Sequence, residues 1–282
     1  MPDEASHRID EHRSDLTPSE RRVADVVLSE PERVAFGTVA EIAERAHTSG
    51  ATVMRLATKL GFDGFVGLQA DVQDELASRL RPAADRIRKV PASDPIERAT
   101  AIEVGNVMAT LHAVDPGVLD RAANHLADPK RRVWVLSGDA SRGAALLFTD
   151  HLGLLRADVH LLDGPDPRLA RRLADLRRGD ALVAIDLRRY ERWVVSTATR
   201  AAAAGARVVA VTDSALSPLA DRAEATLVVR AEGSGPFDSH TGMIAVLNLL
   251  VTAVATRLRR SATDRLDRIE AAWHETLVDR TS

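Results

Sequence analysis

Apolar residues recur at helical spacing along the first eighty residues, where no run has the character of a β-strand. A first helix is predicted to begin at Pro18, because Thr17 is placed to cap it and Glu20, three residues after the cap, completes a capping box. Valines at helical spacing give this segment one apolar face, and Pro31 closes it. The N-terminal region is therefore predicted to be all-α.

Two further helical segments share the apolar spacing i, i+3, i+4 and i+7 on either side of a short linker. Their apolar positions are Val39, Ile42, Ala43 and Ala46, followed by Val53, Leu56, Ala57 and Leu60. Only His47, Thr48 and Ser49 separate them, and so short a linker forces the two helices to cross sharply over one small core. The pattern predicts a helix-turn-helix, which Gly61 ends before another helix from about residue 65 to residue 80.

Beyond this region, helical segments at 95–112 and 116–127 precede short β-branched runs that alternate with helical stretches. The runs span 132–136, 158–162, 181–186, 207–213 and 225–230. None alternates apolar with polar residues, which is expected of strands covered on both faces, and the segments between them are long enough for crossover helices. The pattern predicts an α/β domain built on a doubly wound, five-stranded parallel sheet.

A proline-rich stretch divides the chain. Residues 81–95 carry three prolines and mixed charge, which is typical of a linker. We therefore expect an all-α domain over 1–80, a linker over 81–95 and the α/β domain over 96–282. In doubly wound sheets ligands bind beyond the carboxyl ends of the strands, so the ligand site is expected in the segments after residues 136, 186 and 213.

Composition excludes several classes of site. A net charge of −3 over 282 residues excludes a generally basic nucleic-acid coat. The chain has no cysteine, which excludes disulfides, thiolate metal sites and a cysteine nucleophile, and no cofactor, metal site or catalytic residue is predicted. The polar opening lacks the apolar core of an export signal, and polar residues interrupt the apolar stretch 243–258, which is interpreted as a buried helix. We expect a cytoplasmic protein with no membrane partner.

The second helix of the predicted helix-turn-helix has the features of a DNA-reading helix, since no acidic residue lies between positions 47 and 60. The residues expected on its outward face, led by a serine that also suits the cap, are Ser49, Gly50, Thr52, Arg55 and Lys59. Arg55 is placed to read guanine and Lys59 to meet backbone phosphate, while the two hydroxyls suit phosphate or base edges. An ordinary helical domain with a cationic solvent face would give the same pattern.

Charge around this helix predicts how many copies must bind. Residues 1–80 carry nine Arg and Lys against fifteen Asp and Glu, a net charge of −6. The affinity of one such domain for nonspecific DNA is expected to be weak. We therefore expect a homodimer or homotetramer on double-stranded operator DNA.

The motifs TPSERRVADVVL, ATVMRLATKLGF and the following DGF occur together between Leu16 and Leu76. In this combination the region resembles the N-terminal domain of the RpiR family of bacterial regulators, with almost no gaps. His47 stands where that family usually has glycine in the turn, and Gly50 stands where it usually has a longer polar residue. The resemblance implies a DNA-binding transcription regulator.

The segments RVWVLSGDASRGAALLF and GARVVAVTDSALSPLADRAEATLVV are similar to the sugar isomerase (SIS) domain that follows the linker in such regulators. The resemblance implies a small-molecule site in three loops, whose residues here are Gly138, Asp139, Ser141, Asp186, Arg188, Arg189, Tyr190, Ser239 and His240. Family loops offer glycine and hydroxyl groups to a phosphate, where this chain has Asp139 and Asp186. We therefore expect a carboxylated or polyhydroxylated effector rather than an ordinary sugar phosphate. Alternatively, these acids pair internally with neighbouring arginines as a solvated rim.

Three functions follow from these patterns. The main one is a regulator that senses a small carbohydrate-related or acidic metabolite. The first alternative is an SIS-type sugar-phosphate isomerase, for which His240 is the only attractive general base, although a histidine at a helix start more often caps or packs. The second alternative is a degenerate SIS domain used only for dimerisation.

Overall fold

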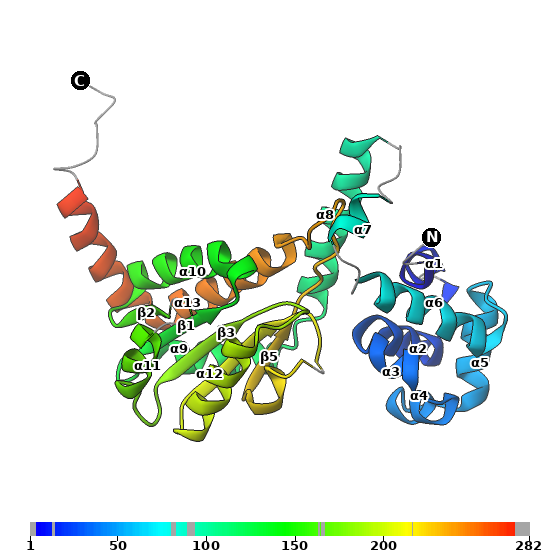
Figure 1. Ribbon diagram of the computed structural model, residues 1–282, viewed down its shortest axis with the longest axis horizontal. Helices are drawn as coiled ribbons and strands as arrows, with labels where there is room; N and C mark the ends of the chain where they lie inside the picture. Colours follow the sequence, from blue (N-terminus) through cyan, green and yellow to red (C-terminus); the bar gives the residue numbers. More distant parts are fainter. Residues whose placement is uncertain are drawn as a thin grey trace. The chain divides into compact units, whose positions relative to one another are not determined.

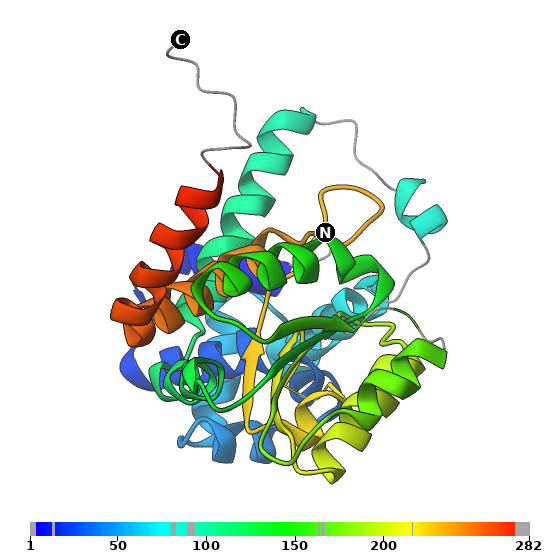
Figure 2. The same ribbon diagram turned by 90° about the vertical axis from the view of Figure 1, so that its left-hand side faces the viewer.

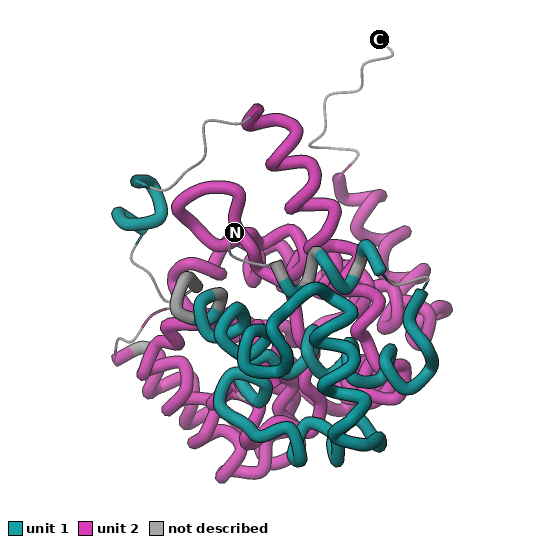
Figure 3. Tube along the Cα trace, turned by 90° about the vertical axis from the view of Figure 1, so that its right-hand side faces the viewer, with its two compact units in different colours: residues 1–89 teal, residues 90–282 magenta. Residues whose placement is uncertain are grey.

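The computed structural model describes residues 4–12, 15–79, 83–88, 94–162, 164, 167–215 and 217–273. The chain forms two compact units, Met1–Lys89 and Val90–Ser282 (Figure 3). The boundary between them lies inside the stretch expected to be a linker, where the described part includes a short helix, α7, over Ala83–Ile87.

The described part of the N-terminal unit before α7 is all-α, as predicted (Figure 1). Its helices are α1 (Glu4–His12), α2 (Pro18–Ser29), α3 (Pro31–Phe36), α4 (Val39–Arg45), α5 (Gly50–Lys59) and α6 (Gly64–Arg79). The apolar faces anticipated for α2, α4 and α5 close one core, to which α1 adds the buried Ala5 and Ile9. The polar N-terminal sequence gave no sign of α1, because only these two apolar side chains anchor it.

Local hydrogen bonds explain where these helices begin and turn. The capping box at the start of α2 is present: the Thr17 hydroxyl accepts the Glu20 N–H, and the Glu20 carboxylate accepts the Thr17 N–H. Between α4 and α5, His47 adopts a left-handed φ of 48°, a conformation that favours glycine and that histidine tolerates better than most residues. Gly61 takes a φ of 81° and ends α5, as expected.

The C-terminal unit is a five-stranded parallel sheet in the order β2-β1-β3-β4-β5, which confirms the predicted doubly wound topology (Figures 1 and 2). The strands are β1 (Val133–Ser137), β2 (Val159–Leu162), β3 (Ala181–Ile185), β4 (Arg207–Thr212) and β5 (Ala225–Val228). The helices are α8 (Pro95–His112), α9 (Pro116–Ala127), α10 (Arg142–Leu155), α11 (Pro167–Ala174), α12 (Arg192–Ala203) and α13 (Thr241–Trp273), with short 3-10 turns η2 (Asp139–Ser141) and η3 (Ala220–Arg222).

Two hydrophobic layers cover the sheet because successive side chains of a strand point to opposite faces. In β1, Val133 and Val135 enter the core shared with α9, α10 and α13, whereas Trp134 and Leu136 enter the core shared with α11 and α12. The central strands β1 and β3 are buried along their whole length, as expected. The edge strand β5 instead alternates buried and half-buried positions, because Ala225 and Leu227 enter the core beside α9 and α13 while the opposite face of this strand is less fully covered.

The long helix α13 is a core helix by its packing. Within the described part of the chain it is the one helix long and apolar enough to cross a membrane by length and composition. Met243, Val246 and Leu250 on it are buried in the core beside β1 and β3. The apolar stretch 243–258 is therefore helical, but only one of its faces is buried, because Ile244, Asn248 and Thr252 on another face are exposed. The helix continues to Trp273.

Helix α8 is fastened to the segment between β5 and α13. The Asn106 side chain accepts the Glu232 N–H at 3.1 Å and donates to the Glu232 carbonyl at 2.7 Å, and the Thr110 hydroxyl accepts the Arg230 N–H at 2.9 Å. A Cβ at Gly242 would lie 2.5 Å from the Thr110 hydroxyl, so glycine is required for this approach. The segment reaching the carboxyl edge of the sheet is thus held against the first helix after the linker.

Candidate functional site

Helix α5 keeps Arg55 exposed but turns Thr52 inward. Val53, Leu56 and Ala57 are buried against the rest of the domain, and Thr52 is only 3% exposed. The expectation that Thr52 lies on the outward face is therefore wrong. Its hydroxyl hydrogen-bonds the Ser49 hydroxyl at 3.1 Å and accepts from the Arg55 guanidinium at 3.1 Å, so it orients two side chains that remain exposed.

Two other predicted DNA contacts have partners within the domain. The Lys59 ammonium donates to the Glu20 carboxylate at 3.0 Å and to the Asp15 carbonyl at 2.6 Å. The Thr17 N–H that Glu20 accepts, together with Lys59, lowers the pKa of Glu20 despite its burial. A Cβ at Gly50 would lie 3.1 Å from a Val39 methyl group, so Gly50 serves the packing of α5 on α4. Ser49 precedes α5 but makes no side-chain cap, contrary to expectation.

The exposed surface of α5 therefore differs in composition from the one that the sequence indicated. Its exposed residues in and just before the helix are Ser49, Ala51, Met54, Arg55 and Thr58. Arg55 is the charged residue of this set, and the other side chains are small or, in the case of Met54, flexible. None of the five is acidic. Such a face suits the major groove of DNA, where one arginine reads guanine and small residues allow close approach.

At the carboxyl edge of the sheet, the loop after β1 is tied to the loop after β3 by Glu191. The Glu191 carboxylate accepts the Asp139 backbone N–H at 2.5 Å and also the Trp193 indole N–H. Glu191 is the N-cap residue of α12, yet its side chain reaches across to the neighbouring loop rather than capping its own helix. This contact joins the ends of two adjacent parallel strands.

Asp186 lies beneath this contact and is 5% exposed. Its carboxylate accepts the Leu187 N–H at 3.0 Å and the Glu191 N–H at 2.8 Å. Burial raises the pKa of Asp186 to about 6; the N–H of Glu191 opposes the shift and the negative charge of Glu191 adds to it. A carboxyl group held in this way accepts hydrogen bonds from hydroxyl or amine groups more readily than it tolerates an added anion.

Arg188 and Tyr190 turn away from Asp186 toward the loop after β4. Arg188 pairs with Asp213 at 2.5 Å, where the Asp213 side chain is 4% exposed. The Tyr190 hydroxyl donates to the same carboxylate at 2.8 Å, and burial raises the pKa of Tyr190. Internal pairing of Arg188 is thus observed, with Asp213 rather than Asp186 as its partner. Arg189 is exposed and has a left-handed φ of 67°.

The opposite side of the same edge carries hydroxyl groups and a histidine. Ser141 is fully buried, and its hydroxyl lies 3.4 Å from the His240 Nε2 atom. The Ser239 hydroxyl donates to the Glu103 carboxylate of α8, which also accepts the Thr241 hydroxyl at 2.5 Å. This side of the edge is therefore connected to the helix that follows the linker.

The structure brings most of the predicted ligand residues to one edge. Gly138, Asp139, Ser141, Asp186, Ser239 and His240 follow or precede elements that end there. Sequence reasoning missed Glu191, Asp213 and Glu103. Asp213 directly follows β4 as Arg188 follows β3, and opposite charges after neighbouring parallel strands are a signal that would have found this pair. No group of three His, Asp or Glu side chains arranged to hold a metal ion occurs among the residues described.

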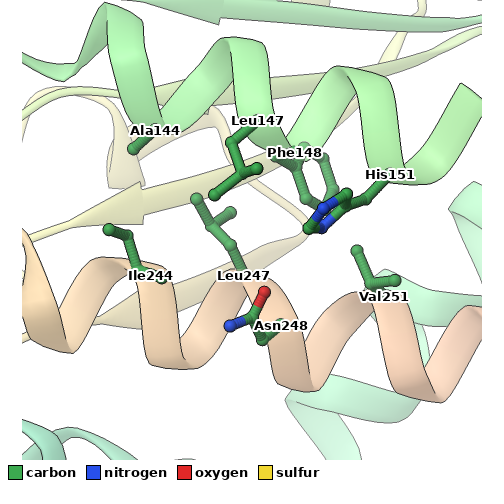
Figure 4. A pocket seen from close by; sticks show the side chains of 8 residues that line it. All are labelled: Ala144, Leu147, Phe148, His151, Ile244, Leu247, Asn248 and Val251. Atoms are coloured by element: carbon green, nitrogen blue, oxygen red, sulfur yellow. The ribbon is translucent and has the colours of Figure 1, made fainter. Parts of the chain in front are cut away.

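A mostly apolar groove lies elsewhere, between α10 and α13 (Figure 4). It is lined by Ala144, Leu147, Phe148, His151, Ile244, Leu247, Asn248 and Val251. Leu147 is 39% exposed and Ile244 is 36% exposed, while the adjacent Leu146 is 43% exposed. Partly exposed aliphatic side chains therefore lie on both helices that form this groove.

Comparison with known proteins assigns the two units separately. Residues 4–79 match the model of the helix-turn-helix domain of the rpiR family, and residues 129–253 match the SIS domain. The HTH-type transcriptional regulator HexR of Escherichia coli is 28% identical over 276 residues, covering 94% of this chain and 92% of HexR.

Solved structures agree with this assignment. The sugar isomerase domain of an RpiR transcription factor from Sphaerobacter thermophilus is 28% identical with a TM-score of 0.59, covering 63% of this chain and 98% of that one. The Vibrio vulnificus NanR protein, complexed with ManNAc-6P, has a TM-score of 0.58 over 98% of this chain and 100% of its own, and at 20% identity it supports the fold alone. With its helix-turn-helix and its SIS domain in this order, the chain belongs to the RpiR family of DNA-binding transcriptional regulators.

Proposed function

We propose that this regulator binds a polyhydroxylated, phosphate-free carbohydrate derivative at the carboxyl edge of its sheet, and that this binding changes its affinity for an operator. The observation that carries the proposal is the buried Asp186, whose carboxylate is held by two backbone N–H groups at the edge where ligands bind in this class of fold. Sugar hydroxyls, or the amine of an amino sugar, are suitable partners for the acids of this edge.

The proposed sensor contacts lie on both sides of that edge. Asp186 and Asp139 supply acceptors, and the Ser141–His240 pair supplies groups that both donate and accept. Arg188 is engaged with Asp213 and supports the loop rather than the ligand. Arg189, exposed in the loop after β3, is the proposed contact for the carboxylate of a sugar acid.

DNA contact is assigned to the exposed face of α5. Arg55 is the proposed base-reading residue, held by the hydroxyl of Thr52. Ser49 is the proposed phosphate contact at the start of the helix, where backbone N–H groups also favour an anion. Lys59, paired with Glu20, is proposed to shape the domain and to add little to phosphate binding.

Pairing of two copies is part of the same proposal. Residues 1–80 carry a net charge of −6, so one domain alone would bind DNA poorly. The groove between α10 and α13, with Leu146, Leu147 and Ile244 exposed beside it, is the proposed contact between two C-terminal units. A two-fold pair would present two α5 helices to a symmetric operator.

We infer that the protein is not an isomerase and that it acts in the cytoplasm, where its DNA lies. The only candidate base that the sequence offered, His240, has its Nε2 atom beside the Ser141 hydroxyl. The inference is supported by the helix-turn-helix that precedes the SIS domain and by the similarity of nearly the whole chain to the transcriptional regulator HexR. Turnover of a sugar phosphate by the purified protein would contradict this inference.

Thermal unfolding with a ligand panel tests the sensor proposal. Neutral sugars, amino sugars, sugar acids and sugar phosphates are added to the full chain, and one neutral or amino sugar is expected to stabilise it by about 2.7 kcal/mol when present at roughly 100 times its Kd. Ser141→Ala should abolish that stabilisation. Ser196→Ala, which removes an exposed hydroxyl on α12, is the matched control and should leave it unchanged. Stabilisation by none of the panel would contradict the proposal.

A further inference from the structure

The carboxylate of Glu191 occupies a place where donors converge on a negative charge. The Asp139 N–H, at the first turn after β1, and the Trp193 indole N–H both donate to it. Glu191 also stands at the N-terminus of the 12-residue helix α12, where the helix dipole favours an anion. Each of these features would serve an anionic group of a ligand if Glu191 were not there.

We propose that the Glu191 carboxylate occupies a position at the N-terminus of α12 that would otherwise bind an anion, and that it thereby makes the regulator reject phosphorylated ligands. The proposal rests on the proposed function, because it concerns the selectivity of the same carboxyl-edge site. Glu191 is thereby a specificity-determining residue, which the sequence reasoning had not singled out.

Close packing supports this role. A Cβ at Gly138 would lie 2.5 Å from an Asp186 carboxylate oxygen and 2.8 Å from a Glu191 carboxylate oxygen. The glycine therefore allows two carboxylates to lie directly against the backbone at the end of β1. A phosphate approaching the same N–H would meet both of them at contact distance.

Electrostatics points in the same direction. Two carboxylates within one hydrogen-bonded unit, Asp186 accepting the N–H of Glu191, already repel each other. A dianion could be accommodated only if Glu191 left its two donors and moved into water. An uncharged or cationic sugar makes no such demand, since hydroxyl or amine groups donate to the carboxylates in place.

The contact also differs from an ordinary helix cap. A capping side chain accepts N–H groups of its own first turn, but no side-chain cap is formed at Glu191. The Glu191 carboxylate instead accepts hydrogen bonds from the Asp139 N–H, which lies 52 residues away in sequence, and from the Trp193 indole N–H. A role confined to starting α12 would not require this reach.

Two variants test the assignment, with binding measured by calorimetry on the full chain. Glu191→Ala empties the position, and Glu191→Gln keeps its shape and one carbonyl acceptor but removes the charge. Glu224→Ala is the matched control, because Glu224 pairs with Arg207 and His125 away from this edge and its loss changes the net charge equally. The probes are inorganic phosphate, glucose 6-phosphate and glucose.

The wild type and Glu224→Ala are expected to show no saturable binding of phosphate at millimolar concentration. Glu191→Ala should bind phosphate and glucose 6-phosphate at least tenfold more tightly than the wild type, with Glu191→Gln between the two. Circular dichroism and melting temperature establish that both variants are folded. If Glu191→Ala does not fold, the gain of phosphate binding is required of Glu191→Gln alone.

The proposal is overturned if the wild type binds glucose 6-phosphate as tightly as a folded Glu191 variant, or if neither folded variant gains phosphate binding. Its failure is distinguishable from failure of the proposed function. Phosphate binding gained on removal of Glu191, without stabilisation of the wild type by any unphosphorylated sugar, supports the closing role and contradicts the proposed effector class.

Discussion

Replacing Asp186 by asparagine should change how the stability of the C-terminal unit depends on pH. In the wild type the pKa of Asp186 is raised to about 6 by burial, against an ordinary value of 3.8. The folded state therefore holds a proton that the unfolded state has released between these two values. Stability falls as the pH rises through this window, and the loss is complete above the folded pKa.

The size of the effect follows from the two values. Between pH 5 and pH 8 this one group should remove on the order of 1 kcal/mol of unfolding free energy from the wild type. Asp186→Asn lacks the titration and should show a correspondingly shallower decline. The asparagine keeps only one acceptor for the two N–H groups of Leu187 and Glu191, so its stability at pH 5 should be lower by about 1–3 kcal/mol.

Urea unfolding at pH 5, 6, 7 and 8 measures this difference, with circular dichroism as the readout. Asp180→Asn is the control. Asp180 is also buried, but although burial opposes ionisation, hydrogen bonds from the Arg177 N–H, Trp134 and Arg132 hold the pKa of Asp180 below its ordinary value. Its titration falls below this pH range, so Asp180→Asn should lower stability without altering the slope. Equal slopes for the wild type and Asp186→Asn would refute the reasoning.

Three further results are expected. Arg55→Ala should cost about 1–3 kcal/mol of operator affinity in an electrophoretic titration. Lys59→Ala should leave the salt dependence of binding almost unchanged, because Lys59 is paired with Glu20. Equal losses of affinity for both variants would show that α5 reads DNA differently. Leu147→Glu should shift the protein toward monomer in sedimentation equilibrium, because it places a charge in the α10–α13 groove; an unaltered mass would move the contact elsewhere. Asn106→Ala should lower unfolding free energy by about 1–3 kcal/mol, since it removes two hydrogen bonds that fasten α8, and denaturant curves matching the wild type would contradict this.

The order of elements in this chain was readable from the sequence because local signals agree with the tertiary structure. The capping box at Thr17 and the left-handed turn at Gly61 are set by neighbouring residues alone. The buried strands β1 and β3 read as continuous apolar runs because both of their faces are covered. These features need no knowledge of what packs against them.

The direction of individual side chains was not readable in the same way. Thr52 was expected on the outward face of α5, yet it lies one turn before Leu56 on the flank of the buried stripe and is itself buried. Lys59 faces Glu20, a partner 39 residues away that only the packing of α2 against α5 reveals. A helical wheel identifies the residues at the centre of a buried face. The position of the neighbouring helix determines whether the residues at the edges of that face are buried or exposed.

At the carboxyl edge the sequence located the loops but not their internal bonds. Asp186 and Ser141 were expected there, because a parallel sheet gathers the ends of its strands. The choice of Asp213 as the partner of Arg188, and of the Asp139 N–H as the partner of Glu191, depends on strand register and loop shape. Charged residues in short loops have several partners within reach, so residue type alone does not choose between them.

Operator binding with and without effector tests the central claim most directly. The operator is obtained by selecting DNA that the purified full chain retains, and its affinity is measured by fluorescence anisotropy at fixed salt, with and without the sugar that stabilises the protein. We predict a change in operator Kd of at least tenfold in the wild type, absent in Ser141→Ala and preserved in Ser196→Ala. An operator Kd unchanged by a saturating ligand would contradict the account of this protein as an effector-responsive regulator.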